Sequence, residues 1–446
     1  MKKNKYEIDM CNGTIMDKLI SFSLPLMVSG ILQLMFNAVD IIVVGRFSGS
    51  QALAAVGSTT ALINVFINLF MGISLGANVL AARYYAAGRD REMSETVHTS
   101  IMLALISGVV MAFVGVFFAK GALELMDTPA DVIDQSALYM RIYFMLYNYG
   151  AAILRAVGDT KRPLYFLIVS GVINAGLNMF LVIVFSLGVA GVAIATVVSQ
   201  AISCVLVLRC LYKSEGSYQL RFSKLCMKKD YIIPIFQVGI PAGIQSTVIN
   251  FSNVLLQSSV NSFGSIAMAG YTASNNVLGF LYTSVNSVTQ ACMSFTSQNY
   301  GVGKYKRMDK VLIDCLILSS GIALVMGGGA YLFGTEILQI YTGDPEVIRC
   351  GMEILSITTV PYFLCGIMDL FPGALRGMGC SAVPMILSVI GTVGTRIVWI
   401  FGIFPQHRSL YVLFISYPGS WIITIILQVI CYLIVRKKVH SRAAAV

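Results

Sequence analysis

Two stretches of this sequence, "AARYYAAGRDREM" at residues 81–93 and "TSQNYGVGKYKRM" at residues 296–308, resemble each other. Three positions are identical in both: Tyr85, Gly88 and Met93, then Tyr300, Gly303 and Met308. Other matches follow in the same order: "GSQALAAVG" at 49–57 with "GSIAMAGYT" at 264–272, "LRAVG" at 154–158 with "LRGMG" at 375–379, and Pro25 with Pro241. Because order and spacing are kept along the chain, we predict an internal duplication.

The composition is that of a membrane protein. Of the 446 residues, 57% are hydrophobic and only 12% are charged, and the mean hydropathy is +0.79. Soluble chains carry about 25% charged residues. Apolar runs of about 20 residues, long enough to cross a bilayer as a helix, recur from one end to the other. The predicted fold class is an all-α polytopic membrane protein.

The apolar runs predict twelve transmembrane helices, six in each copy. They are expected at 16–45, 52–82, 96–119, 133–156, 163–186, 189–210, 231–260, 267–298, 310–333, 350–374, 380–403 and 411–435. An even number of helices per copy gives both copies the same orientation, so two six-helix lobes should surround a central cleft as parallel repeats. The expected domains are a lobe at 1–211, a polar cytoplasmic linker at 212–230 and a lobe at 231–446.

The net charge of +10 is explained by membrane topology. With the N-terminus inside, most Lys and Arg fall on cytoplasmic segments and the opposite loops are acidic, as the positive-inside rule requires. We therefore expect a multi-pass protein of the bacterial plasma (inner) membrane with both termini cytoplasmic. Lipids are the expected partners, nucleic acid is not, and we expect a monomer. No small-residue cleavage site follows the basic N-terminus, so no removable signal peptide is predicted.

One acidic residue lies inside the first span. The stretch "LMFNAVDIIVVG", residues 34–45, places Asp40 among apolar neighbours. A carboxylate at that depth costs roughly 2.5–3.5 kcal/mol on insertion scales and usually marks a functional site. Asn174 and Asn178, one helical turn apart on the fifth span, and Thr196 on the sixth can share its level in the membrane. These hard oxygen ligands suit H⁺ or Na⁺, and interhelical hydrogen bonding is the alternative for the amides and hydroxyl.

Three stretches of the sequence resemble one family of transporters. "LPLMVSGILQLMFNAVDIIVVGRFSGSQALAAVG" and "MGISLGANVLAARYYAAG" resemble the first repeat of the multidrug and toxic compound extrusion (MATE) family, in its bacterial MepA-like branch, and "GIPAGIQSTVINFSNVLLQSSVNSFG" resembles the second. The resemblance implies a secondary active antiporter that exports amphipathic, often cationic drugs in exchange for H⁺ or Na⁺. It assigns the ion site to Asp40, Asn174, Asn178 and Thr196, with no cofactor beyond the coupling ion. Some members carry further acids on helices 5 and 7, which are absent here.

The substrate is expected to contact polar residues of the cleft. Asp369 on the tenth span, which the repeat pairs with Asn148, can attract a cation, or it can simply partner Arg376. The other expected cleft residues are Gln245, Asn253, Gln257, Asn275, Asn276, Tyr282 and Asn286. Met and aromatic side chains would give soft, adaptable walls. Pro25 and Pro241 are the predicted hinges of helices 1 and 7.

Other function classes fit the sequence less well. A flippase for a lipid-linked precursor, in the same wider fold superfamily, would favour a basic cavity, and Arg396 on the eleventh span keeps that alternative open. An enzyme is not predicted, because no HExxH, GxSxG or paired catalytic acids occur. "GVGKYK" at 301–306 lacks phosphate-loop spacing. Neither the substrate nor the coupling ion follows from the residues alone.

Overall fold

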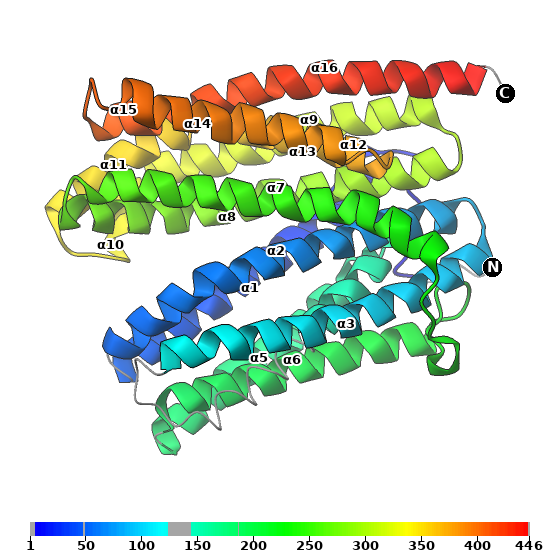
Figure 1. Ribbon diagram of the computed structural model, residues 1–446, viewed down its shortest axis with the longest axis horizontal. Coiled ribbons are helices and arrows are strands. Elements are labelled where there is room, and N and C mark those ends of the chain that lie inside the picture. The colour runs from blue at the N-terminus through cyan, green and yellow to red at the C-terminus, as the bar shows by residue number, and fades with distance from the viewer. Residues whose placement is uncertain (1–4, 48–49, 124–143, 186, 445–446) are drawn as a thin grey trace. The chain divides into compact units, whose positions relative to one another are not determined.

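The computed structural model describes residues 5–47, 50–123, 144–185 and 187–444. Side chains within these ranges are not described at 37, 39–47, 50–64, 114–123, 183, 188–190, 193 and 442–444. The described residues are mainly helical and include no strands (Figure 1); the longest non-helical stretches are 5–15 and the connection after α6.

The first half contains α1 (Met16–Phe47), α2 (Ser50–Ala86), α3 (Asp90–Leu123), a helix described over 144–156, α5 (Lys161–Met179), the π-helical turn η1 (Phe180–Val184) and α6 (Gly188–Lys213). A 3₁₀ turn, η2 (Phe222–Lys224), lies in the connection that follows. The second half contains α7 (Lys229–Asn261), α8 (Ser265–Gly301), α9 (Tyr305–Leu332), α10 (Gly334–Gln339), α11 (Pro345–Thr358), α12 (Tyr362–Gly377), α13 (Ala382–Ser388), η3 (Val389–Gly394), α14 (Thr395–Val398), η4 (Trp399–Ile403), α15 (Leu410–Phe414) and α16 (Ser416–Ala444).

The turns of the two halves repeat each other in backbone conformation. Gly88 and Gly303 follow the second helix of each half with φ of 66° and 72°, and Gly158 and Gly379 precede the fifth with φ of 94° and 88°. Residues with a Cβ rarely adopt positive φ, so glycine is the residue that these turns require. The matched glycines of the sequence repeat therefore mark structurally matched turns.

Among the described residues, nine helices are long and apolar enough to cross a membrane, or ten if the bent pair α11 and α12 is one span. α8 has 37 residues but does not qualify by hydropathy, because Ser, Thr and Asn recur along it. Only part of the predicted fourth span is described, since 133–143 lie outside the described residues.

The chain divides into two compact units, and the boundaries between them fall inside α1 and α7. Unit 1 comprises 1–10 and 28–243, and unit 2 comprises 11–27 and 244–446. The sequence predicted lobes at 1–211 and 231–446, so the first part of α1 groups with unit 2 and the first part of α7 with unit 1. Each change of unit follows a proline inside the helix, Pro25 in α1 and Pro241 in α7.

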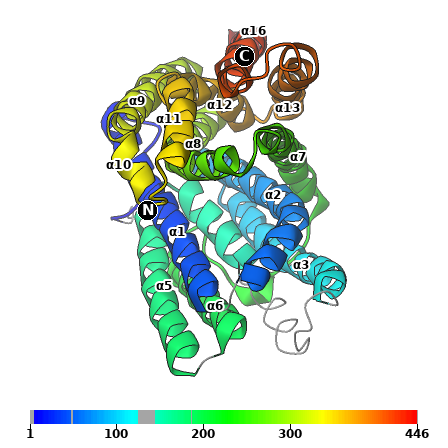
Figure 2. The same cartoon turned by 90° about the vertical axis from the view of Figure 1, so that its left-hand side faces the viewer.

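In unit 1, small residues let helices approach closely. A Cβ on Gly72 of α2 would lie 2.4 Å from the backbone nitrogen of Gly243, and one on Gly239 would lie 2.4 Å from the Cα of Ile73. Close backbone contact of this kind is how helices associate in lipid, where no hydrophobic force drives them together. α5 and α6 lie side by side with α1 along them (Figure 2).

In unit 2, α8 packs against α11 and α12, and α12 packs against α9 and α16. The predicted continuous helix at 350–374 is wrong, because α11 and α12 meet at a 51° bend. Pro361 lies in the break, and proline cannot donate the backbone hydrogen bond that a continuous helix needs. The predicted helix at 380–403 includes two π-helical segments, η3 and η4, on either side of α14.

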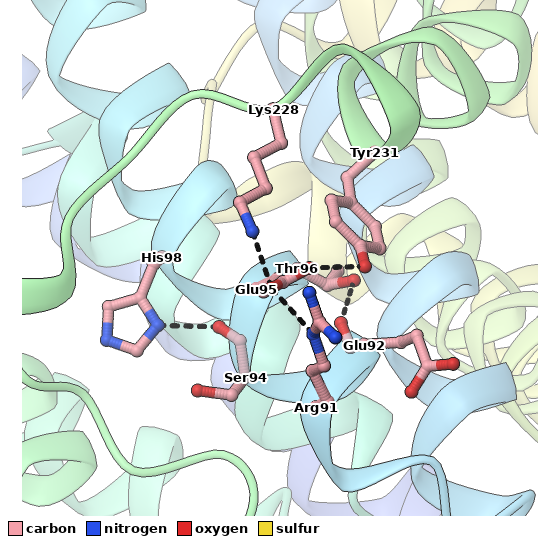
Figure 3. Close-up of polar contacts among 8 residues, drawn as sticks. All are labelled: Arg91, Glu92, Ser94, Glu95, Thr96, His98, Lys228 and Tyr231. Atoms are coloured by element: carbon pink, nitrogen blue, oxygen red, sulfur yellow. Dashed lines mark hydrogen bonds and ion pairs between the residues drawn. The ribbon is translucent and has the colours of Figure 1, made fainter.

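A carboxylate anchors the connection between the halves to α3. Glu95 accepts hydrogen bonds from Lys228 Nζ at 2.5 Å and from Tyr231 OH at 2.5 Å (Figure 3). His98 Nε2 accepts from the backbone N–H of Arg221 at 3.1 Å, so the other ring nitrogen, Nδ1, carries the proton in the neutral ring and donates to Ser94 O at 2.6 Å. The linker predicted at 212–230 is therefore fixed to unit 1 at several points.

Candidate ion and substrate sites

A buried polar network joins α5 and α6 within unit 1. Asn174 and Asn178 are 6% and 0% exposed. Asn178 Nδ2 donates to Asn174 Oδ1 at 3.1 Å. Asn174 Nδ2 donates to Ser199 Oγ at 3.3 Å and to Thr196 Oγ1 at 3.5 Å, both on α6. The structure thus brings together three of the four residues predicted for the ion site.

Ser199 belongs to the same network, although the sequence analysis missed it. The available signal was its spacing, because Thr196 and Ser199 are three residues apart and share a helix face. Thr196 donates its hydroxyl proton to Val192 O at 2.9 Å, and Ser199 donates to Thr196 O at 2.9 Å. Toward Asn174, both hydroxyl oxygens therefore act as acceptors. The network presents neutral oxygens, which are the ligands that hard cations prefer.

A glycine lets α1 approach this network closely. A Cβ on Gly171 of α5 would lie only 1.9 Å from Cε2 of Phe36 of α1. Gly171 lies one turn before Asn174 on the same helix face. Asp40 lies one turn beyond Phe36 along α1, and its side chain is outside the described residues. The helix that carries the predicted carboxylate therefore runs against the helix that carries the amides.

Asp369 and Arg376, which the sequence considered as partners, occupy the same helix of unit 2. Arg376 Nη2 donates to Gln245 Oε1 of α7 at 2.6 Å, and no hydrogen bond or ion pair from a described residue reaches Asp369. Asp369 is only partly buried. The structure therefore gives Arg376 a hydrogen-bond partner in Gln245, while the charges of Arg376 and Asp369 still interact with each other.

Arg396 is the most deeply buried charged side chain among the described residues of unit 2, with 3% of its surface exposed. Its Nη1 donates to Asn253 Oδ1 of α7 at 2.9 Å, and its Nε donates to Ser420 Oγ of α16 at 3.4 Å. Its guanidinium carbon lies 4.2 Å from the ring centroid of Tyr417. Neutral groups from two helices, α7 and α16, therefore contact this cation. Asn253, predicted as a substrate contact, is its amide partner.

The remaining predicted cleft residues fall into two groups. Asn286 Nδ2 donates to Tyr282 OH at 3.4 Å and Gln290 Nε2 donates to Asn286 Oδ1 at 3.0 Å, which gives α8 a continuous polar stripe. Asn275, Asn276 and Gln257 are exposed. Asn148 instead belongs to unit 1, where its Nδ2 donates to Phe144 O within its own helix at 2.7 Å.

The family model MatE matches residues 25–180 and 241–401, one match in each half of the duplication. This chain belongs to the MATE family. The Bacillus subtilis protein "Probable multidrug resistance protein YoeA" is 31% identical over 434 residues, which cover 94% of this chain and 93% of that protein. "Multidrug export protein MepA" of Staphylococcus aureus is 22% identical over 380 residues, covering 83% and 84%.

Solved MATE structures have the same fold. A MATE protein in complex with MaL6 superposes with a TM-score of 0.90 at 18% identity, over 98% of this chain and 100% of that one. A multidrug resistance MATE transporter in its outward-facing conformation superposes with a TM-score of 0.87 at 19% identity, over the whole of both chains. The predicted architecture of twelve transmembrane helices in two lobes is that of this family and is confirmed.

Proposed function

We propose that this MATE transporter is a secondary active antiporter that exports amphipathic, often cationic organic compounds in exchange for H⁺ or Na⁺. The observation that carries the proposal is the neutral oxygen network of α5 and α6, together with the contact of α1 with α5 at Phe36, one turn before Asp40 in the sequence. The names of the relatives YoeA and MepA, a probable multidrug resistance protein and a multidrug export protein, support the substrate class.

In this proposal the Asp40 carboxylate completes an ion site with Asn174, Asn178, Thr196 and Ser199. An unneutralised carboxylate in lipid is costly. Binding a proton or Na⁺ removes that charge, and the amide and hydroxyl oxygens can replace the ion's hydration shell. One carboxylate with neutral oxygens serves either ion, so the coupling ion is a matter for measurement.

Coupling requires drug and ion to favour different conformations of the transporter. Drug binds while Asp40 is ionised and leaves after an external cation has neutralised it. α1 and α7 each pass from one unit to the other just after a proline, so we propose Pro25 and Pro241 as the hinges of this change. A membrane potential contributes about 2.3 kcal/mol per charge per 100 mV.

Drug contacts are assigned mainly to unit 2. Asp369 would attract the positive charge of a drug, and the polar stripe of α8 would orient it. The other proposed contacts are Asn148, Gln245, Asn253, Gln257, Asn275 and Asn276. The basic residues of the helix ends favour a plasma-membrane orientation with both termini cytoplasmic, and we propose a monomer as the transporting unit.

The proposal is tested by drug efflux from proteoliposomes in which Na⁺ and pH gradients are imposed separately. Asp40→Asn should reduce gradient-driven efflux at least tenfold, because the neutral side chain no longer changes charge with the ion. Glu215→Gln, which removes an exposed acid from the linker, is the matched control and should transport normally. Full gradient-driven transport by a folded Asp40→Asn protein would refute the proposal.

A flippase for a lipid-linked precursor is the second candidate function. The observation that favours it is Arg396, a buried cation suited to a phosphate group. Translocation of a labelled lipid precursor, compared with drug efflux in the same vesicles, separates the two functions.

A further inference from the structure

Arg396 has no acidic counterion among the described residues. Its hydrogen-bond acceptors are an amide and a hydroxyl, and its flat face lies on the Tyr417 ring. Burying a cation in a membrane protein without an anion is unfavourable, and such residues usually mark a pathway or a ligand site. Two donors are used, whereas a guanidinium has five in a planar fork. The Nη2 amine makes no hydrogen bond with a described residue.

The local backbone supports a role beyond packing. Arg396 lies in the short helical turn α14, between the π-helical segments η3 and η4. π-helical turns leave backbone hydrogen bonds poorly matched and occur frequently at functional sites. η3 is held tightly against α16, where Thr392 Oγ1 lies 3.0 Å from Thr424 Oγ1 and Gly391 leaves no room for a Cβ. The irregular helix is therefore packed in place and holds the arginine at a defined position.

The guanidinium is connected to a polar face of α7. Its partner Asn253 is half-buried, and Asn250 and Gln257, three residues before and four after it, are exposed. These three amides share one helix face. A polar ligand that binds this face can contact Asn253, which is hydrogen-bonded to Arg396. All of these residues belong to unit 2.

We infer that Arg396, with Asn253 and Ser420, binds an oxyanion, a carboxylate or a phosphate group, carried by an amphipathic ligand. Two parallel N–H donors match the two oxygens of such a group. The inference deepens the proposed export function by naming a substrate class, acidic or zwitterionic amphiphiles alongside cations. The same chemistry would hold the headgroup of an anionic lipid.

The test is ligand-dependent thermal stabilisation of the full-length protein in detergent at constant ionic strength. The probes are benzoate, phenyl phosphate and short-chain phosphatidic acid, with benzyl alcohol as the uncharged control. The wild-type protein should be stabilised by the anions and not by benzyl alcohol. Arg396→Gln should weaken the apparent affinity at least tenfold, and Arg396→Lys should give an intermediate loss because a point charge replaces the fork.

Asn253→Asp keeps the test valid if Arg396→Gln does not fold. It supplies an internal carboxylate to the arginine, so the protein should be at least as stable as wild type and bind the anions at least tenfold more weakly. Arg408→Gln removes an exposed arginine of unit 2 and should bind as wild type does. Stabilisation by phosphatidic acid alone would assign the site to a lipid headgroup, and stabilisation by benzoate or phenyl phosphate would assign it to a solute.

Anion stabilisation that is absent in wild type, or equal in wild type, Arg396→Gln and Asn253→Asp, would overturn the inference. Because the assay needs no ion gradient, its result is independent of antiport. Asp40→Asn should bind the anions normally even where its transport is lost, so failure of the oxyanion site and failure of ion coupling are distinguishable.

Discussion

In unit 1 the fifth and sixth helices of the repeat bring together two amides on α5 and two hydroxyls on α6, whereas unit 2 places an arginine on the matching fifth helix. The fifth helix carries Asn174 and Asn178 in one unit and Arg396 in the other. The sixth contributes hydroxyls in both, Thr196 and Ser199 in unit 1 and Ser420 in unit 2. The same two helices of the repeat therefore bring together neutral oxygens in one unit and a cation with a hydroxyl in the other.

The starts of the third helices, α3 and α9, have not diverged in this way. Glu95 of α3 accepts from Tyr231 and Lys228, and Asp309 of α9 accepts from Tyr432 OH at 3.1 Å and Arg436 Nε at 2.8 Å. In each unit an acid near the start of the third helix is bonded to distant chain: Glu95 to residues that follow α6, and Asp309 to residues of α16 itself. The comparison teaches that the duplication kept its turns and the acids that start its third helices, while its fifth helix came to carry neutral amides in one unit and a cation in the other.

The largest expected effect is that one variant in each unit impairs one activity and spares the other: ion coupling in unit 1 and anion binding in unit 2. Asn178→Leu should raise the ion concentration needed for half-maximal efflux at least tenfold, about 1.4 kcal/mol or more in binding, because the proposed site loses an amide. It should leave anion binding unchanged. Arg396→Gln should weaken anion binding and leave the ion dependence of efflux unchanged.

The measurement is the ion dependence of efflux set beside the anion-dependent thermal shift. Ser170→Ala, on the same helix as Asn178, is the control, because that hydroxyl bonds only to Leu167 O of its own helix. If both variants impaired both readouts equally, the two interiors would form one functional site and the comparison would fail.

The sequence predicted much of this arrangement because its signals are local. Asn174 and Asn178 stand out in an apolar helix, and their spacing alone places them on one face. Ser199 was missed because a hydroxyl that bonds to its own helix backbone is ordinary in a membrane helix. The partners of Arg396 come from two other helices, α7 and α16, and no local sequence pattern predicts such contacts. The π-helical turns around it were not predicted for the same reason.

The second prediction concerns the close approach of α1 to α5 in unit 1. Gly171→Ala should destabilise the protein by about 1–3 kcal/mol, the usual cost of overpacking, because the added Cβ would clash with the Phe36 ring. Gly176→Ala, on the same helix, meets nothing within 4 Å and should be neutral or slightly stabilising.

Chemical unfolding in mixed micelles measures both variants. In unit 2, Gly391→Ala should behave like Gly171→Ala, because its Cβ would lie 2.5 Å from Thr424 Oγ1. Equal stability of Gly171→Ala and Gly176→Ala would show that α1 and α5 are not tightly packed, and would remove the support for bringing Asp40 to the amides.

The smallest expected effect concerns Glu95 and Asp309, whose substitutions should lower the stability of the protein by similar amounts. Glu95→Gln and Asp309→Asn should each cost about 1 kcal/mol of unfolding free energy, because each removes a charge-assisted hydrogen-bond network that is only partly screened by solvent. The two carboxylates are 18% and 19% exposed, so their losses are comparable. Glu346→Gln breaks a pair with Arg349 whose side chains are 58% and 78% exposed and should cost almost nothing. If only one of Glu95→Gln and Asp309→Asn lowered the free energy of unfolding, the two units would share the geometry of these contacts but not their contribution to stability.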